Sequence, residues 1–181
     1  MYKLKTVQRS TYVDDATIRR ETTAEHVCSV LLLARYFLSR MHHTMNQQRI
    51  MLLLLYHDMV EVSSGDVSVF DTKHAEFKQD EQRHVDVVLR KVPSSLHDEV
   101  KDVLREWSEQ KTMESRFCHA LDKLDPLVQS LSCPHGWKTY KVTEAMLRDK
   151  KEHYVRDFPE LLAFFNACIA YAYKQGFLVA R

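Results

Sequence analysis

Glycine and proline are scarce in this chain, which has only three glycines and four prolines among 181 residues. Folds built from strands need many turns, and turns draw heavily on these two residue types. The scarcity therefore predicts an all-α fold. We expect a bundle of about six or seven helices joined by few connections.

The chain has the size and composition of one globular domain. Its length falls within the usual domain range, and no internal repeat, low-complexity tract or linker interrupts it. Hydrophobic residues make up 45% and charged residues 28% of the chain, which is enough apolar sequence for a core and excludes wholesale disorder. We expect residues 1–181 to form a single domain.

Charge and hydropathy narrow the classes of partner. Lys and Arg total 26 against 25 Asp and Glu, a balance that argues against stable nucleic-acid binding. The longest apolar run, residues 50–56, is far shorter than the roughly 20 residues of a membrane span. No secretory signal is visible, and the four cysteines lack a Cys-x-x-Cys pair. We therefore expect a cytoplasmic protein with reduced thiols and no membrane association.

Two helices are expected in the first third of the chain. Residues 22–25 read Thr-Thr-Ala-Glu, the form of a capping box, and the helix that they open is expected to end near residues 42–43. A second helix is expected from residues 46–47. Its segment 50–55 is apolar on every side and should be buried all round, and Gly65 is a stop signal.

The remaining elements are predicted from periodicity and from proline. Residues 1–20 are polar and are expected to be irregular or short-helical, and residues 67–70 are too few to define a strand. Helices are expected over residues 72–90, from Pro93 to about Trp107, and over 113–131, 138–151 and 159–175. Pro126 lies inside one of these and predicts a kink or break around Asp122.

The second helix carries a buried polar cluster at its end. His57 lies seven residues after Ile50 and four after Leu53, so it extends the apolar face of that helix. Asp58 and Glu61 lie beside it, within one turn. Burying these three groups without partners would cost several kcal/mol, and a divalent metal ion would compensate. Imidazole and carboxylate are ligands of Zn, Co, Mn and Fe.

A His-Asp pair alone is a weak signal, because a second copy, His97-Asp98, occurs on an expected surface helix and is interpreted as structural. The first copy differs because three further residues lie at fixed offsets after it. Glu61, Gly65 and Asp66 complete the pattern His-Asp-x-x-Glu-x-x-x-Gly-Asp, which composition alone rarely produces.

This pattern resembles the HD-domain phosphohydrolases. Residues 24–26 read Ala-Glu-His, and the histidine precedes His57 by 31 positions. The sequence is most similar to the small bacterial 5'-deoxynucleotidases and their eukaryotic HD-domain relatives. Residues 116–122 resemble the family segment that supplies the last ligand, and the similarity covers about residues 4 to 130.

The resemblance implies one divalent transition metal ion, Co, Mn, Zn or Fe rather than Mg. Its implied ligands are His26, His57, Asp58 and Asp122. Asp125 is a competitor for the last position, although it directly precedes Pro126 and could serve the kink instead. His119, one turn before Asp122, is either a further ligand or a helix histidine satisfied by its own neighbours.

The resemblance also implies the groups that act on the substrate. Glu61 and Asp66 are the expected catalytic residues: one orients or deprotonates the water and the other holds or protonates the leaving side, and the two roles are exchangeable. Arg9 is the expected phosphate-binding residue. Arg19 and Arg20 are its competitors.

Two further positions concern the substrate pocket. Lys73 is a second phosphate candidate, with a solvated lysine as the alternative. Ser10 stands where the deoxynucleotidases often have Trp, and residues 67–70 replace a Pro-Thr-Pro-like stretch, so selectivity for a deoxyribose does not transfer.

The implied activity is metal-dependent removal of phosphate from (deoxy)nucleoside 5'-monophosphates by a homodimer. A deoxynucleoside triphosphate triphosphohydrolase is the alternative within the same chemistry. A nucleotide-sensing module without turnover and a helical interaction scaffold are the alternatives from other classes.

Overall fold

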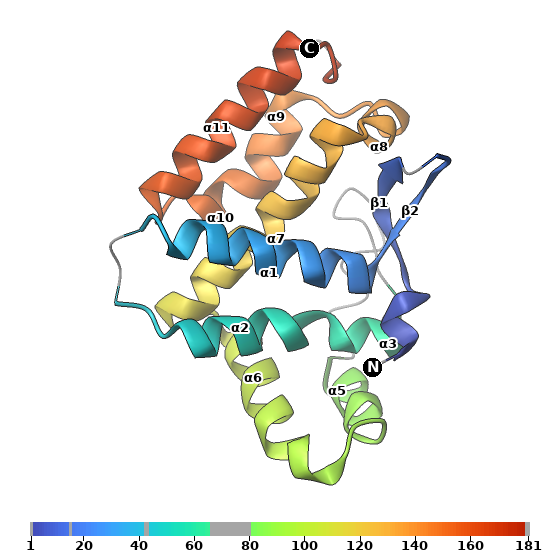
Figure 1. Cartoon of the computed structure of the whole chain (residues 1–181), viewed down its shortest axis with the longest axis vertical. Helices are drawn as coiled ribbons and strands as arrows, with labels where there is room; N and C mark the ends of the chain where they lie inside the picture. The colour runs from blue at the N-terminus through green and yellow to red at the C-terminus, as the bar shows by residue number, and fades with distance from the viewer. Residues whose placement is uncertain (1, 15, 42–43, 66–80, 180–181) are drawn as a thin grey trace.

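The computed structural model describes residues 2–14, 16–41, 44–65 and 81–179. These residues are mainly helical, with one two-stranded sheet at the edge of the bundle (Figure 1), so the all-α class is confirmed. Within the described ranges, helices of at least nine residues are α1 (Thr23–Leu38), α2 (Gln47–Tyr56), α5 (Glu81–Leu89), α6 (His97–Glu109), α7 (Met113–Ser132) and α11 (Pro159–Lys174).

Helix α1 begins where the capping box predicts. The Thr22 side chain accepts a hydrogen bond from the Glu25 amide, and the Glu25 carboxylate accepts one from the Thr22 amide. These reciprocal bonds satisfy two donors at the helix start. The helix ends at Leu38, several residues before the predicted end; residues 42–43 lie outside the described part of the chain.

Helix α2 also begins as predicted, with Asn46 as its cap. Ile50, Leu53 and Leu54 are fully buried, but Leu55 is 36% exposed. The prediction of burial on every side is therefore wrong, because one face of α2 lies at the surface.

A short 3-10 turn, His57–Val60, continues the path of α2 and leads into α3 (Glu61–Ser64). Gly65 then ends the helix with φ of +75°, a backbone conformation suited to glycine, as the sequence predicts.

The next helices form one end of the molecule (Figure 1). The expected surface helix over 72–90 is described as α5 from Glu81; residues 72–80, and the segment 67–70, lie outside the described ranges. A 3-10 turn (Ser94–Leu96) precedes α6, whose Val100, Val103 and Leu104 are buried.

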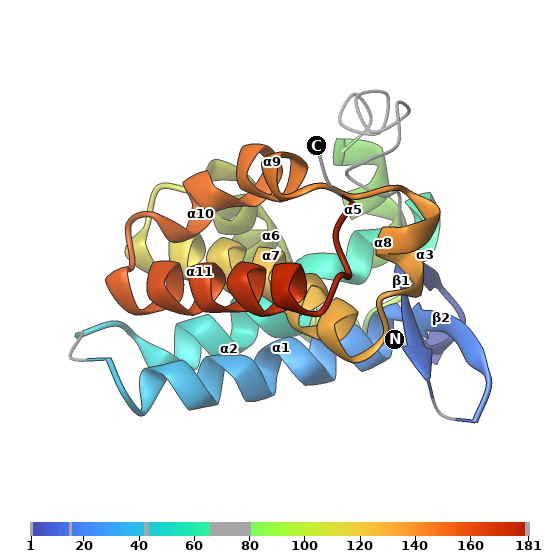
Figure 2. The ribbon, with the colours of Figure 1, turned by 90° about the horizontal axis from the view of Figure 1, so that it is seen from above.

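Helix α7 crosses the middle of the bundle and packs against α1, α2, α10 and α11 (Figures 1 and 2). It runs through Pro126 without a break, so a break near Asp122 is not found. Packing on several sides holds the helix together where a hydrogen bond is missing. Helix α7 thereby carries its middle residues into the core.

The predicted helix over 138–151 is instead several short elements. They are α8 (His135–Thr139), α9 (Glu144–Leu147), a π-helical turn (Arg148–Glu152) and α10 (His153–Val155). Lys141 has a positive φ of 51°, which interrupts the helix, and Thr143 caps the new start at α9.

The N-terminal segment corrects another expectation. After a 3-10 turn (Tyr2–Lys5), β1 (Gln8–Asp14) pairs antiparallel with β2 (Ile18–Thr22), whereas the sequence predicts irregular or short-helical structure throughout. The hairpin packs on α7 and α8. Its buried residues include polar ones that face the helices rather than water, so the strands do not show the alternation of apolar and polar residues that predicts a strand.

Helices α1 and α2 run antiparallel and side by side, as both views show (Figures 1 and 2). This arrangement brings the start of α1 next to the end of α2. In the described ranges, no helix is long and apolar enough to cross a membrane.

Candidate metal centre

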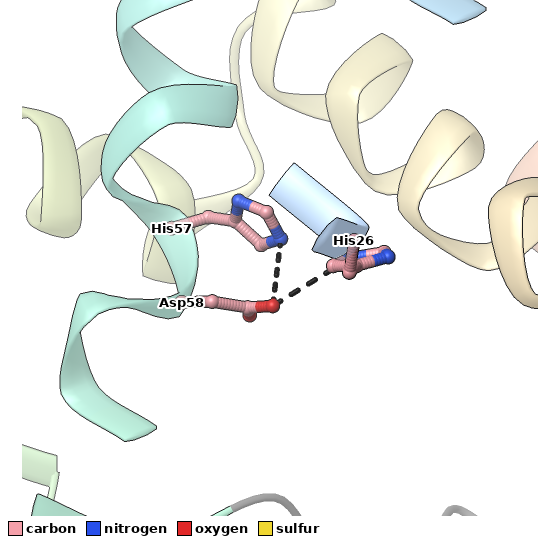
Figure 3. A group of neighbouring side chains, drawn as sticks. All are labelled: His26, His57 and Asp58. Carbon is pink, nitrogen blue, oxygen red and sulfur yellow. Dashed lines mark ion pairs between the residues drawn. The ribbon is translucent and has the colours of Figure 1, made fainter. Parts of the chain in front are cut away.

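Three helical segments bring four polar side chains to one place. His26 lies in the first turn of α1, His57 and Asp58 lie in the turn after α2, and Asp122 lies in the middle of α7. Figure 3 shows the two rings and Asp58 pointing toward one another. The antiparallel pairing of α1 and α2, crossed by α7, positions all four of the residues implied as metal ligands.

The distances define a compact group of donor atoms. His57 Nε2 lies 3.2 Å from Asp58 Oδ2 and 3.7 Å from Asp122 Oδ1. His26 Nε2 lies 3.6 Å and 3.1 Å from the same two oxygens. Both histidine side chains are fully buried, and the carboxylates are 15% and 7% exposed. Each imidazole therefore presents the same nitrogen to the same pair of oxygens.

The outer nitrogens of the two rings are held by other groups. His26 Nδ1 donates to Asp125 Oδ2 at 2.7 Å, and His57 Nδ1 donates to the carbonyl oxygen of Leu54 at 2.8 Å. A proton on Nδ1 leaves the lone pair of a neutral imidazole on Nε2, and such outer partners are typical of metal-binding histidines. The hydrogen bonds thus orient both lone pairs inward.

The donor set fits a cation. His57 Nε2 is buried and has no hydrogen-bond partner among the described residues. In the neutral ring this atom is an acceptor that faces carboxylate oxygens, which are acceptors too. Acceptors that face one another at such short distances are stable only around a positive charge. His26, His57 and Asp58 each offer a ligand atom within 4.8 Å of the others and could hold a divalent metal ion.

The charged side chains around the centre also favour a bound cation. Five carboxylates gather here, and three basic side chains accompany them among the described residues. The carboxylates are Glu21, Asp58, Glu61, Asp122 and Asp125, and the basic groups are Arg9, Lys123 and Lys151. Burial raises the pKa of Glu21, yet the carboxylates outnumber the cations even when Glu21 is neutral.

The neighbouring carboxylates have the largest net effect on the pKa of the two imidazole rings. Burial lowers the pKa of His57, but Asp58 and Asp122 outweigh it and raise that pKa to about 10. For His26, burial and Arg9 lower the pKa, and the surrounding carboxylates raise it to about 9. Without a metal ion the two rings thus attract protons, and a metal ion competes for the same lone pairs.

Arg9 and Glu61 adjoin this group on the Asp58 side. Arg9 Nη1 donates to Asp58 Oδ2 at 2.8 Å and to Glu61 Oε1 at 3.3 Å. The Thr23 hydroxyl donates to Glu61 Oε2 at 2.7 Å. Strand β1 therefore delivers Arg9 to the centre, and both Glu61 oxygens are held beside the candidate ligands.

The other residues singled out in the sequence lie elsewhere or are not described. Arg19 pairs with Glu25 at 2.7 Å, and Arg20 donates to the Arg9 carbonyl at 3.0 Å. Of the two competitors, Arg20 thus supports the strand that carries Arg9. Asp66 and Lys73 lie outside the described residues.

The sequence allows two interpretations each for Asp125 and His119, and the structure gives contacts for both residues. Asp125 binds the outer nitrogen of His26, so it acts as a partner of the ring. His119 Nε2 donates to the Trp107 carbonyl at 2.9 Å, which satisfies it within the helix bundle. Burial lowers the pKa of His119 to about 4.

Three neighbours of the centre are not predicted by the sequence. The Trp107 ring lies 4.6 Å from the His57 ring and 3.8 Å from the His119 ring, between centroids. Lys123 Nζ lies 2.6 Å from Asp122 Oδ2, and Lys151 Nζ donates to the Lys123 carbonyl at 2.9 Å. The position of Lys123 directly after Asp122 was the one available signal; the other two contacts join distant segments.

A second acidic group adjoins the first. Glu21, His26 and Asp125 also bring ligand atoms within 4.8 Å of one another, and all three are buried. His26 is common to both groups, but its Nδ1 is engaged by Asp125. The group around His57 and Asp58 therefore has the better-directed lone pairs.

A mainly helical bundle with two buried histidines and two adjoining aspartates at its centre is the combination to compare with known families. The model of the HD domain family matches residues 1–162, which is most of the chain, and the chain belongs to this family. The resemblance seen in the sequence is thereby confirmed.

Individual proteins similar to this chain include a bacterial phosphohydrolase and animal 5'-deoxynucleotidases. The chain is 29% identical to a predicted metal-dependent phosphohydrolase from Magnetospirillum magnetotacticum, whose crystal structure it matches with a TM-score of 0.86 over 99% of this chain and 90% of that one. It is 28% identical to the 5'-deoxynucleotidase HDDC2 of Xenopus laevis over 71% of this chain and 63% of that protein. Identity to the Homo sapiens HDDC2 is 26% over 71% and 62%. The chain thus spans less than two thirds of the length of these curated relatives.

Proposed function

We propose that this protein is a metal-dependent phosphohydrolase, and specifically a 5'-nucleotidase acting on (deoxy)nucleoside 5'-monophosphates. The observation that carries the proposal is the buried, inward-facing Nε2 of His57, set among a second imidazole and two carboxylates. The names of the relatives, a metal-dependent phosphohydrolase and 5'-deoxynucleotidases, support the same chemistry.

His26, His57, Asp58 and Asp122 are the proposed ligands of one divalent ion. Two neutral imidazoles and two carboxylates suit Co, Mn, Zn or Fe better than Mg, which prefers oxygen ligands. When bound, such an ion polarises a phosphoryl oxygen and lowers the pKa of coordinated water.

Glu61 is proposed to orient the attacking water and accept its proton. One of its oxygens takes a hydrogen bond from Thr23 and the other from Arg9, so the carboxylate is fixed within one turn of Asp58. A positioned carboxylate of this kind is a general base. Asp66 is proposed to hold or protonate the leaving oxygen, and the two roles are exchangeable.

Arg9 is proposed to bind the phosphate from the Asp58 side. Its planar guanidinium has several donors in a fixed geometry that matches phosphate oxygens. Strand β1 holds it beside Asp58 and Glu61. Lys73 stays a second candidate for the same anion.

The proposal extends to the whole chain. Residues 1–181 are proposed to work as one domain, because a single buried cluster includes residues from Leu4 to Ala172. A homodimer is proposed as well. An apolar patch on α1 and α2, which includes the 67% exposed Leu32 and the 36% exposed Leu55, supports it. Light scattering of the purified chain tests this point.

The central experiment is phosphate release from a panel of nucleoside mono- and triphosphates. The protein is stripped of metal and then supplied with Co, Mn, Zn or Mg. We expect inorganic phosphate from 5'-monophosphates, dependent on added metal and lost in Glu61→Gln while metal binding persists. Tripolyphosphate from triphosphates would replace this proposal with a triphosphohydrolase. Wild-type rates in Glu61→Gln would refute the role of that residue.

A further inference from the structure

The two oxygens of Asp122 face different neighbours. Oδ1 faces the inner nitrogens of His26 and His57, at 3.1 Å and 3.7 Å. Oδ2 lies 2.6 Å from the ammonium nitrogen of Lys123. One carboxylate group therefore separates a lysine charge from the candidate metal position. No motif of the sequence assigned any role to this lysine.

Lys123 is also the most accessible of the three described cations at the centre. Its side chain is 24% exposed, whereas the Arg9 side chain is 11% exposed. Lys151 is 5% exposed as a whole residue, and its ammonium donates to the carbonyl oxygen of Lys123. Part of the Lys123 side chain therefore faces solvent beside the centre.

The surroundings of Lys123 hold it in place. The bond from Lys151 fixes its backbone, and the Tyr154 ring lies 5.7 Å from its ammonium nitrogen. Lys151 lies in the π-helical turn and Tyr154 in α10, so one irregular segment provides both contacts. Such turns inside helices recur at functional sites. An ammonium group has three donors, and Asp122 takes one of them.

We propose that Lys123 is a substrate-binding residue that contacts the phosphoryl group from the Asp122 side, while Arg9 approaches from the Asp58 side. This inference rests on the proposed phosphohydrolase function and adds a second phosphate contact to it. A phosphate dianion at the centre then meets cations from two sides. Lysine binds phosphate as a compact point charge, which complements the planar fork of arginine.

A purely structural role for Lys123 makes a different forecast. If the lysine only orients the Asp122 carboxylate through its outer oxygen, its loss weakens metal binding and leaves the affinity of the loaded protein for phosphate unchanged. If it binds phosphate, its loss weakens phosphate binding and leaves most of the metal affinity. The two affinities, measured separately, distinguish these roles without any turnover.

The experiment is titration calorimetry on wild type, Lys123→Met and Lys150→Met, first with Mn²⁺ and then with inorganic phosphate on the Mn²⁺-loaded protein. Lys150 is a matched control, because it lies on the same π-helical turn as Lys151 but pairs with Asp149 at the surface. We expect Lys123→Met to bind phosphate at least about tenfold more weakly, with Mn²⁺ affinity within about threefold of wild type. The control should match wild type in both.

Unchanged phosphate affinity in Lys123→Met, or a loss of Mn²⁺ binding that accounts for the whole effect, would overturn the proposal. If that variant does not fold, Lys123→Arg supplies the test, since it keeps the charge and should retain more phosphate affinity than Lys123→Gln; equal affinities would overturn it. A wild-type protein that binds phosphate through Lys123 but hydrolyses no nucleotide would refute the proposed function alone.

Discussion

The same dipeptide occurs twice in this chain with different consequences. At the end of α2, His57 and Asp58 are packed among His26 and Asp122, and the inner nitrogen of His57 has no hydrogen-bond partner among the described residues. At the start of α6, His97 is only half-buried and donates to the carbonyl oxygen of Val92 at 3.2 Å.

The difference lies in the groups that other segments bring to each pair. Asp98 lies in the first turn of α6, where a carboxylate interacts favourably with the helix dipole and needs no other partner. Asp58 faces two imidazoles and a guanidinium. Two adjacent residues become a candidate metal centre only where α1 and α7 supply the other half.

The largest expected effect is a difference in activity between variants of Asp58 and of Asp98. Asp58→Ala removes a proposed ligand, so metal-dependent phosphate release should fall by more than about a hundredfold, beyond the range seen for outer partners of ligands. Asp98→Ala should keep activity within about twofold. Phosphate release at saturating Mn²⁺ measures both, and equal activities would remove the distinction between the two pairs.

The next effect concerns the outer partner of His26. Asp125→Asn weakens the hydrogen bond that orients the ring, and metal affinity should fall about tenfold to a hundredfold. Calorimetric titration with Mn²⁺ gives the value, with Asp98→Asn as the control. An affinity equal to wild type would show that Asp125 does not orient a ligand.

A third variant tests the packing behind the rings. Trp107 contacts both His57 and His119, so Trp107→Ala should lower the free energy of unfolding by about 3 kcal/mol and weaken metal binding severalfold. Trp107→Phe should restore most of both losses. Urea denaturation and Mn²⁺ titration report the two quantities, and full metal affinity in Trp107→Ala would exclude support of His57 by the indole.

The smallest effect is a pH dependence. Burial lowers the folded-state pKa of His119 to about 4, against 6.5 for an ordinary histidine. The unfolded chain therefore takes up the proton first, and stability present above pH 6.5 is lost as the pH falls toward 4. The loss should reach about 2 kcal/mol by pH 5.

Comparison of wild type with His119→Gln isolates this contribution. The variant should lose less stability than wild type between pH 6.5 and 5 in urea denaturation. Parallel profiles for the two proteins would show that His119 does not titrate in this way.

Local sequence was enough to predict helix boundaries that depend only on neighbouring residues. The capping box at Thr22, the helix start near residues 46–47 and the stop at Gly65 each depend on residues within one turn. The hairpin was missed because its strands bury polar groups such as Arg9 and Glu21, which an apolar alternation does not reveal. The division of the predicted helix over 138–151 was missed because neither the positive φ of Lys141 nor the π-helical turn has a strong sequence signal.

The candidate site, like the fold, was predictable only in part from the sequence. The buried end of α2 indicated His57, Asp58 and Glu61 from spacing alone, whereas His26 and Asp122 came from the family resemblance. The contacts that surround them join segments far apart in the chain. Asp125 bonds to His26 across 99 positions, and no helical period carries that information.

The position of the metal ion itself is the property to measure first. Crystals of the protein grown with Mn²⁺ would be measured for anomalous scattering. We predict one strong peak per chain, enclosed by His26, His57, Asp58 and Asp122. A peak between Glu21 and Asp125 instead, or no peak at the His57 nitrogen, would contradict the proposed centre.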